Sequence, residues 1–239
     1  MLWTNRIFCG MIKDSVYLRD RQMRNLGGIK SMRKVVKFGG SSLASAEQFK
    51  KVGDIIRADK GRKYVVPSAP GKRFDGDIKV TDMLYACYAK AEKKEDITAS
   101  IAAIRERYME IINGLGLSLS LDDQFEVISE NFKKLAGSNY AASRGEYLNG
   151  IIMANYLGYE FIDAAEVIVF HEDGTFDAET TNEKLSARLA ECDNAVIPGF
   201  YGATAEGKVT TFSRGGSDIT GSLIAKAVHA DLYENWTDV

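Results

Sequence analysis

Short apolar runs alternate along the chain with longer stretches of helical periodicity. The first run, 34–38, is rich in valine, and apolar residues recur at helical spacing over 45–60. Ser45 and Gln48 have the spacing of a capping box at the start of that second stretch. A further run follows at 64–67. This alternation predicts an α/β domain in which helices cover a mainly parallel sheet.

The middle of the chain is predicted to be helical. Thr81 is expected to cap one helix, and two more helices are expected over about 97–113 and 122–136, which could form a lobe over the sheet. Another helix is expected to open at Ser143 and to run to about Leu157.

The last third of the chain is predicted to be rich in strands. Glu206-Gly207 is expected to turn a hairpin. The other expected elements are strands near 159–163, 167–170 and 195–198, a helix near 180–191, a helix that ends near Ala230, and a final strand into Trp236.

A phosphate-binding turn is predicted where the first strand ends, at Lys37-Phe38-Gly39-Gly40-Ser41-Ser42. Glycine permits positive φ and lets backbone N–H groups approach an anion, the following helix presents its positive end, and Lys37 adds a mobile charge. A tight turn with a surface lysine is the simpler alternative.

A second motif, Ser213-Arg214-Gly215-Gly216-Ser217-Asp218, repeats this arrangement, and two such turns at parallel strand ends would lie side by side. Arginine presents a planar fork suited to a carboxylate or phosphate. The alternative for Asp218 is a helix N-cap, and Ser143 with Glu146 has capping-box spacing, which would explain that glutamate without any function.

Composition narrows the classes of function. Hydrophobic residues make up 45% of the 239 positions, and no apolar run reaches the roughly 20 residues of a membrane helix, so no membrane span is predicted. The net charge is −2, with positive charge concentrated in residues 1–34. The acidic remainder argues against a nucleic-acid partner.

The thiol, imidazole and glycine patterns exclude several kinds of site. Three cysteines and two histidines are too scattered for a zinc site or a disulfide framework, which fits a reducing cytoplasm. P-loop, dinucleotide-binding and nucleophile-elbow motifs are absent from the sequence. Residues 1–31 are expected to be a poorly ordered basic leader, with Met32 as a more natural start and one domain over 32–239.

These motifs, together with Trp236-Thr237-Asp238-Val239, closely resemble the aspartokinase family over about residues 33–239. Ser68-Ala69-Pro70-Gly71 and Thr81-Asp82 also fit that family. The resemblance implies the three-layer αβα sandwich of the amino-acid kinase superfamily. It also implies transfer of phosphate from ATP to the side-chain carboxylate of L-aspartate, giving 4-phospho-L-aspartate on the way to lysine, threonine and methionine.

The resemblance also assigns roles to individual residues. It implies Mg²⁺ held mainly by the phosphates, with no protein side chain as metal ligand. The implied roles are Lys37 and Asp218 at the transferring phosphoryl group; Gly39, Gly40 and Ser41 in the phosphate-facing turn; Glu146 on the substrate ammonium; Arg214 on the α-carboxylate, with Ser217 and Ser68 assisting; and Gly215, Gly216, Thr237 and Asp238 at the nucleotide.

The family pattern is incomplete here, because the family's kinase domain continues beyond the Trp-Thr-Asp-Val segment and regulatory domains usually follow. The aspartate-binding side of the site is expected to be complete, and the ATP-binding side is expected to be truncated. The intact protein is expected to be a homo-oligomer. Two alternatives stay open: a non-catalytic fragment that binds aspartate or joins intact subunits, and a kinase for another small substrate such as glutamate. Glu146 with Arg214 favours an α-amino acid over a nucleoside monophosphate.

Overall fold

The computed structural model describes residues 32–213 and 215–237, so the expected leader 1–31, Arg214 and Asp238 lie outside the described residues. A central sheet of five parallel strands runs through the molecule in the order β3-β6-β2-β1-β9. Its strands are β1 (Lys34–Phe38), β2 (Arg62–Pro67), β3 (Glu160–Phe161), β6 (Ala195–Val196) and β9 (Leu232–Trp236). The prediction of a parallel sheet is confirmed.

A second, smaller sheet has the order β5-β4-β7-β8. Its β4 and β7 are parallel and the other two pairs are antiparallel, with β7 and β8 forming the predicted hairpin. A separate second sheet was not predicted from the sequence. Its strands are β4 (Val169–Phe170), β5 (Phe176–Asp177), β7 (Tyr201–Thr204) and β8 (Val209–Thr211).

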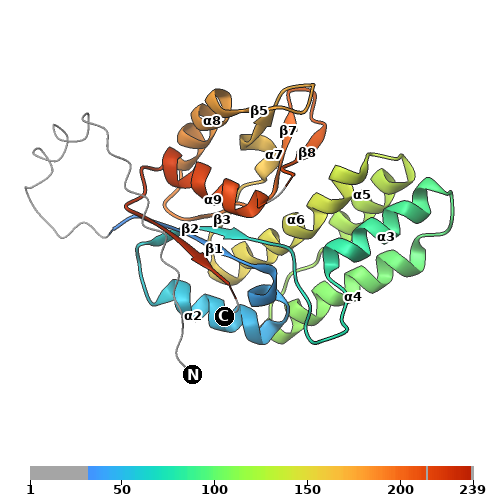
Figure 1. Cartoon of the computed structure of the whole chain (residues 1–239). Coiled ribbons are helices and arrows are strands. Elements are labelled where there is room, and N and C mark those ends of the chain that lie inside the picture. Colours follow the sequence, from blue (N-terminus) through green and yellow to red (C-terminus); the bar gives the residue numbers. More distant parts are fainter. Residues whose placement is uncertain (1–31, 214, 238–239) are drawn as a thin grey trace, which may run out of the picture.

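Helices cover both faces of the central sheet (Figure 1). Alternation along β1 explains why: Val36 and Phe38 enter one apolar cluster, and Val35 enters another on the opposite face. The first cluster holds α2 (Ala46–Arg57) and α6 (Ser138–Leu157), whereas the second holds α7 (Ala164–Val167), α8 (Ala178–Ala190) and α9 (Gly216–Ala227). The α/β class with a sheet between helical layers is therefore confirmed.

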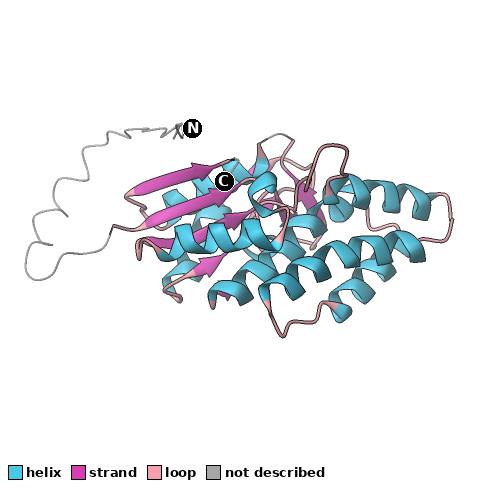
Figure 2. Ribbon diagram, turned by 90° about the horizontal axis from the view of Figure 1, so that it is seen from below, coloured by secondary structure: helices cyan, strands magenta, loops and turns pink. Residues whose placement is uncertain are grey.

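A helical lobe extends beyond the strands (Figure 2). It is built from α3 (Val80–Glu92), α4 (Thr98–Leu115) and α5 (Asp122–Lys133), which pack on α6. The sequence predicted a lobe of two helices over the sheet, whereas the observed lobe has three helices and lies beside the sheet.

Two predicted helix starts are wrong. Lys79 precedes α3 without a side-chain cap, so Thr81 lies inside the first turn. Helix α6 begins at Ser138, five residues before Ser143, because Gly137 at φ 103° turns the chain into the helix there. By contrast, Ser45 accepts a hydrogen bond from the Gln48 N–H, as the capping box predicts.

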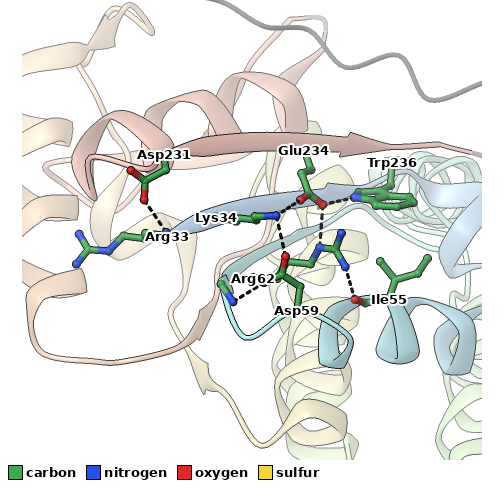
Figure 3. Close-up of polar contacts among 9 residues, drawn as sticks. Arg33, Lys34, Ile55, Asp59, Arg62, Asp231, Glu234 and Trp236 are labelled. Carbon is green, nitrogen blue, oxygen red and sulfur yellow. Dashed lines mark hydrogen bonds and ion pairs between the residues drawn. The ribbon is translucent and has the colours of Figure 1, made fainter. Parts of the chain in front are cut away.

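A network of charged side chains joins three neighbouring strands on the α2 side of the sheet (Figure 3). Glu234 of β9 accepts hydrogen bonds from Arg62 Nε at 2.9 Å and from Trp236 Nε1 at 2.9 Å. Lys34 Nζ lies 3.3 Å from Glu234 and 2.7 Å from Asp59, which follows α2. These contacts tie the edge strand β9 to β1 and β2.

Candidate functional site

Lys37 occupies the end of β1 and points toward α9. It pairs in register with Asn235 of β9, and its Nζ lies 2.8 Å from Asp218 Oδ1 and 3.3 Å from Asn235 Oδ1. Asn235 Nδ2 donates to the same Asp218 oxygen at 3.0 Å. The lysine is only 7% exposed. The alternative of a surface lysine is therefore wrong, and the structure brings together Lys37 and Asp218, the two residues predicted at the transferring phosphoryl group.

The turn after Lys37 approaches a second loop closely. Gly71 N donates to Gly40 O at 2.8 Å, and a Cβ added to Gly40 would lie 2.8 Å from Ala69 O. Neither Gly39, with φ −72°, nor Gly40 has a positive φ, so Gly40 serves close approach of the two loops. Ser41 lies in a short 3-10 helix, η1 (Gly40–Leu43), that precedes α2. The helix predicted near 45–60 is α2, and η1 lies between it and the glycine turn.

The second glycine turn starts α9. Gly215 is its N-cap, with φ 60°, and Asp218 is the third helical residue. The N-cap alternative for Asp218 is therefore wrong, which leaves its carboxylate for Lys37. Strand β8 of the small sheet precedes this turn, whereas β1 of the central sheet precedes the first turn. The prediction that both turns follow strands of one parallel sheet is therefore wrong.

Ser217 lies at the start of α9 and reaches the loop after β2, where Ser68 Oγ donates to Ser217 Oγ at 3.2 Å. A Cβ at Gly199 would lie 2.6 Å from Ser217 Cβ, so a small residue is needed there. The predicted substrate-side serines are therefore brought together.

Glu146 lies inside α6 and is 7% exposed. Burial raises the pKa of its carboxyl group to about 7, against the opposing effects of the Ala69 N–H and the charge of Arg144. Ser143 Oγ donates to Tyr140 O rather than capping a helix start. The capping-box explanation of Glu146 is therefore wrong, because no helix begins at Ser143.

Arg144 lies between Ser143 and Glu146 and was given no role from the sequence. Its guanidinium is buried against the rings of Tyr140, Tyr147 and Tyr201, at 4.7, 4.4 and 5.3 Å from the ring centroids. Its Nε and Nη2 donate to Ser143 Oγ. These aromatic faces stabilise a cation for which the described residues supply no ion-pair partner at salt-bridge distance.

Two asparagines complete the site and were missed by the sequence analysis. Asn235 could have been found from the parallel register that sets it beside Lys37. Asn149 is fully buried and its Nδ2 donates to Ser68 O at 2.6 Å. Its position three residues after Glu146 was the available signal, since such residues share a helix face.

The remaining predicted site residues are Thr237, Gly216, Arg214 and Asp238. Thr237 is exposed, and a Cβ built on Gly39 would lie 3.7 Å from its Cγ2, so the two are neighbours. Gly216 packs against Phe200. Arg214 and Asp238 belong to the part of the chain that is not described.

The described residues contain no cluster of three or more His, Cys, Asp or Glu side chains that could hold a metal ion. Over the same residues, no helix is long and apolar enough to cross a membrane. The side chains of this site instead offer a buried cation beside glycine-rich turns, and a buried carboxyl group near two serines. Such an arrangement suits a ligand that carries both positive and negative charge.

Several known proteins with sequence similarity to this chain are named aspartokinases. Aspartokinase 3 of Bacillus subtilis is 41% identical over 222 residues, covering 86% of this chain and 48% of that protein. The lysine-sensitive aspartokinase 3 of Escherichia coli is 29% identical over 226 residues, covering 86% and 49%. The chain thus spans about half the length of these relatives.

Solved structures of aspartokinases are also similar to this chain. The crystal structure of Clostridium acetobutylicum aspartate kinase superposes with a TM-score of 0.84 at 52% identity, covering 87% of this chain and 48% of that one. E. coli aspartokinase III in complex with aspartate and ADP gives a TM-score of 0.71 at 26% identity, covering 87% and 49%. The sequence profile of the amino acid kinase family matches residues 32–239, so the chain belongs to that family.

Proposed function

We propose that this chain carries the aspartate-binding and phosphoryl-transfer part of an aspartokinase, which phosphorylates the side-chain carboxylate of L-aspartate from ATP. The observation that carries the proposal is the contact of 2.8 Å between Lys37 Nζ and Asp218 Oδ1. It links the two glycine-rich motifs at one point. The similarity to proteins named aspartokinases supports the choice of substrate.

Lys37 supplies positive charge between the phosphates and the attacking carboxylate. Phosphoryl transfer depends mainly on positioning and on charge neutralisation, so a fixed cation lowers the barrier. Asp218 and Asn235 hold the ammonium group of Lys37 in place. The aspartate carboxylate is ionised at neutral pH and is itself the nucleophile, so no general base is needed.

Recognition of the amino acid falls to charged groups. Glu146 takes the substrate ammonium, and Arg214 takes the α-carboxylate in a bidentate pair. Ser217 and Ser68 assist with their hydroxyl groups.

The nucleotide lies toward the glycine turns, with Gly39, Gly40 and Ser41 facing the phosphates. Mg²⁺, held mainly by those phosphates, supplies further neutralisation of charge when bound. Gly215, Gly216, Thr237 and Asp238 are assigned to nucleotide binding. Homo-oligomeric assembly and a cytoplasmic location stay predictions.

Replacing Lys37 tests this proposal. Lys37→Met should abolish transfer without unfolding the protein, because the charge acts during the reaction and not in the core. Rate and melting temperature are measured in a preparation in which the wild-type sequence is active, with the exposed Lys50→Met as control. A normally folded variant that keeps more than about a tenth of the rate, a loss below about 1.4 kcal/mol, would show that the role is wrong.

A further inference from the structure

Unpartnered buried polar atoms gather on one face of α6. Among the described residues, Glu146 Oε2 and Asn149 Oδ1 are both buried and both lack a hydrogen-bond partner. A buried acceptor without a donor costs free energy, so two of them together indicate a missing donor. Residues three apart on a helix have Cβ atoms about 5–6 Å from each other, so one small group can reach both side chains.

The same short segment fixes both side chains. The Ala69 N–H acts on the Glu146 carboxyl group, and Asn149 Nδ2 donates to the Ser68 carbonyl at 2.6 Å. A carbonyl oxygen only accepts, so the amide nitrogen of Asn149 must face Ser68. The orientation of the amide is thereby set, and Oδ1 remains as an acceptor.

We propose that Asn149 is a second ligand of the substrate ammonium, which donates one N–H to Asn149 Oδ1 and another to Glu146. The inference rests on the proposed function. A primary ammonium has three donors and no acceptor, which matches one charged and one neutral acceptor. Because Asn149 also holds Ser68, and Ser68 contacts Ser217, binding of the ammonium fixes the hydroxyl groups on the substrate side.

The test compares aspartate with succinate, which has the same two carboxylates and no amine. Binding of each to the 239-residue chain is measured by calorimetry for wild type and for Asn149→Leu. We expect the variant to bind aspartate about ten-fold or more weakly, the usual effect of losing a hydrogen bond to a charged group, while succinate affinity changes less than about two-fold. Asn113→Leu, at an exposed position of α4, should change neither.

Asn149→Ala serves as a second variant, since it adds no bulk to the core, and thermal melting checks that each protein is folded. Equal losses of affinity for aspartate and for succinate would show that Asn149 only holds Ser68 in place, which would overturn the proposal. An unchanged preference for aspartate in either folded variant would also overturn it. If the wild type binds neither ligand, or both equally, the proposed function itself is wrong, which is a different result.

Discussion

Burial raises the pKa of the Glu146 carboxyl group from its usual value of 4.5 to about 7. The folded protein therefore holds a proton between about pH 4.5 and 7 that the unfolded chain has released. Stability should fall as pH rises through this window, by about 3 kcal/mol in all. An ammonium ligand would reverse this loss, because it favours the ionised form.

Glu146→Gln should remove this part of the pH dependence, since the amide does not titrate. Unfolding free energies from urea titrations at pH 5 and pH 8 measure it. The decline between the two values should be smaller in the variant than in wild type by about 3 kcal/mol. The exposed Glu92→Gln serves as control and should decline as wild type does; the same decline in Glu146→Gln would contradict the assignment.

At the residue scale, the sequence named Lys37, Asp218, Ser68 and Ser217 as site residues, because motif and resemblance name residue types that carry chemistry; their contacts with one another come from the structure. It did not predict Asn235 or Asn149. Asparagine is common in turns and caps, so its type alone says little. Its role here depends on pairing across strands and on burial inside a helix, which only the folded chain displays.

At the scale of elements, hydrophobic periodicity predicted where the long helices lie but not the residues at which α3 and α6 begin. The apolar face of α6 extends on both sides of Ser143, so a capping-box spacing in its interior gave a false start. The strands expected near 167–170 and 195–198 are present as β4 and β6, with two residues each. Such short runs do not indicate their partners: β4 pairs with β7, more than 30 residues later, and the second sheet was therefore missed.

The contact between the loops after β1 and β2 can be tested by adding one methyl group. A Cβ at Gly71 would lie 2.7 Å from Gly40 C and 2.8 Å from Ser41 N, both backbone atoms. Gly71→Ala should destabilise the fold by about 1–3 kcal/mol. It should also lower the transfer rate about 100-fold, because a small displacement of positioned groups is costly.

Urea unfolding and steady-state assays measure both effects, with the neighbouring exposed Lys72→Ala as the matched control. Wild-type activity in Gly71→Ala would mean that the loop contact does not position the phosphate-facing turn.

At the scale of the whole molecule, the charge network of Figure 3 holds β9 on the sheet. Glu234→Ala would leave Arg62 and Trp236 Nε1 without their shared acceptor at a site where Glu234 and Arg62 have side chains only 13% and 15% exposed. We expect a loss of about 1–3 kcal/mol in unfolding free energy.

The comparison is Lys134→Ala, which breaks an exposed pair with Glu130 and should change stability by less than about 0.5 kcal/mol. Chemical denaturation measures the unfolding free energy of both variants. Similar losses in the two would mean that the network contributes little to the stability of the fold.

The position of β1 between β2 and β9 has a consequence for synthesis on the ribosome. Lys37 and Asn235 are 198 residues apart in sequence, yet they are partners in the sheet. One edge of β1 can pair as soon as β2 emerges, whereas the other must wait for almost all of the described chain. An open strand edge invites pairing with other chains, and such distant contacts form slowly. We therefore expect the nascent protein to be open to wrong pairing at the strand that carries Lys37 until β9 has been synthesised.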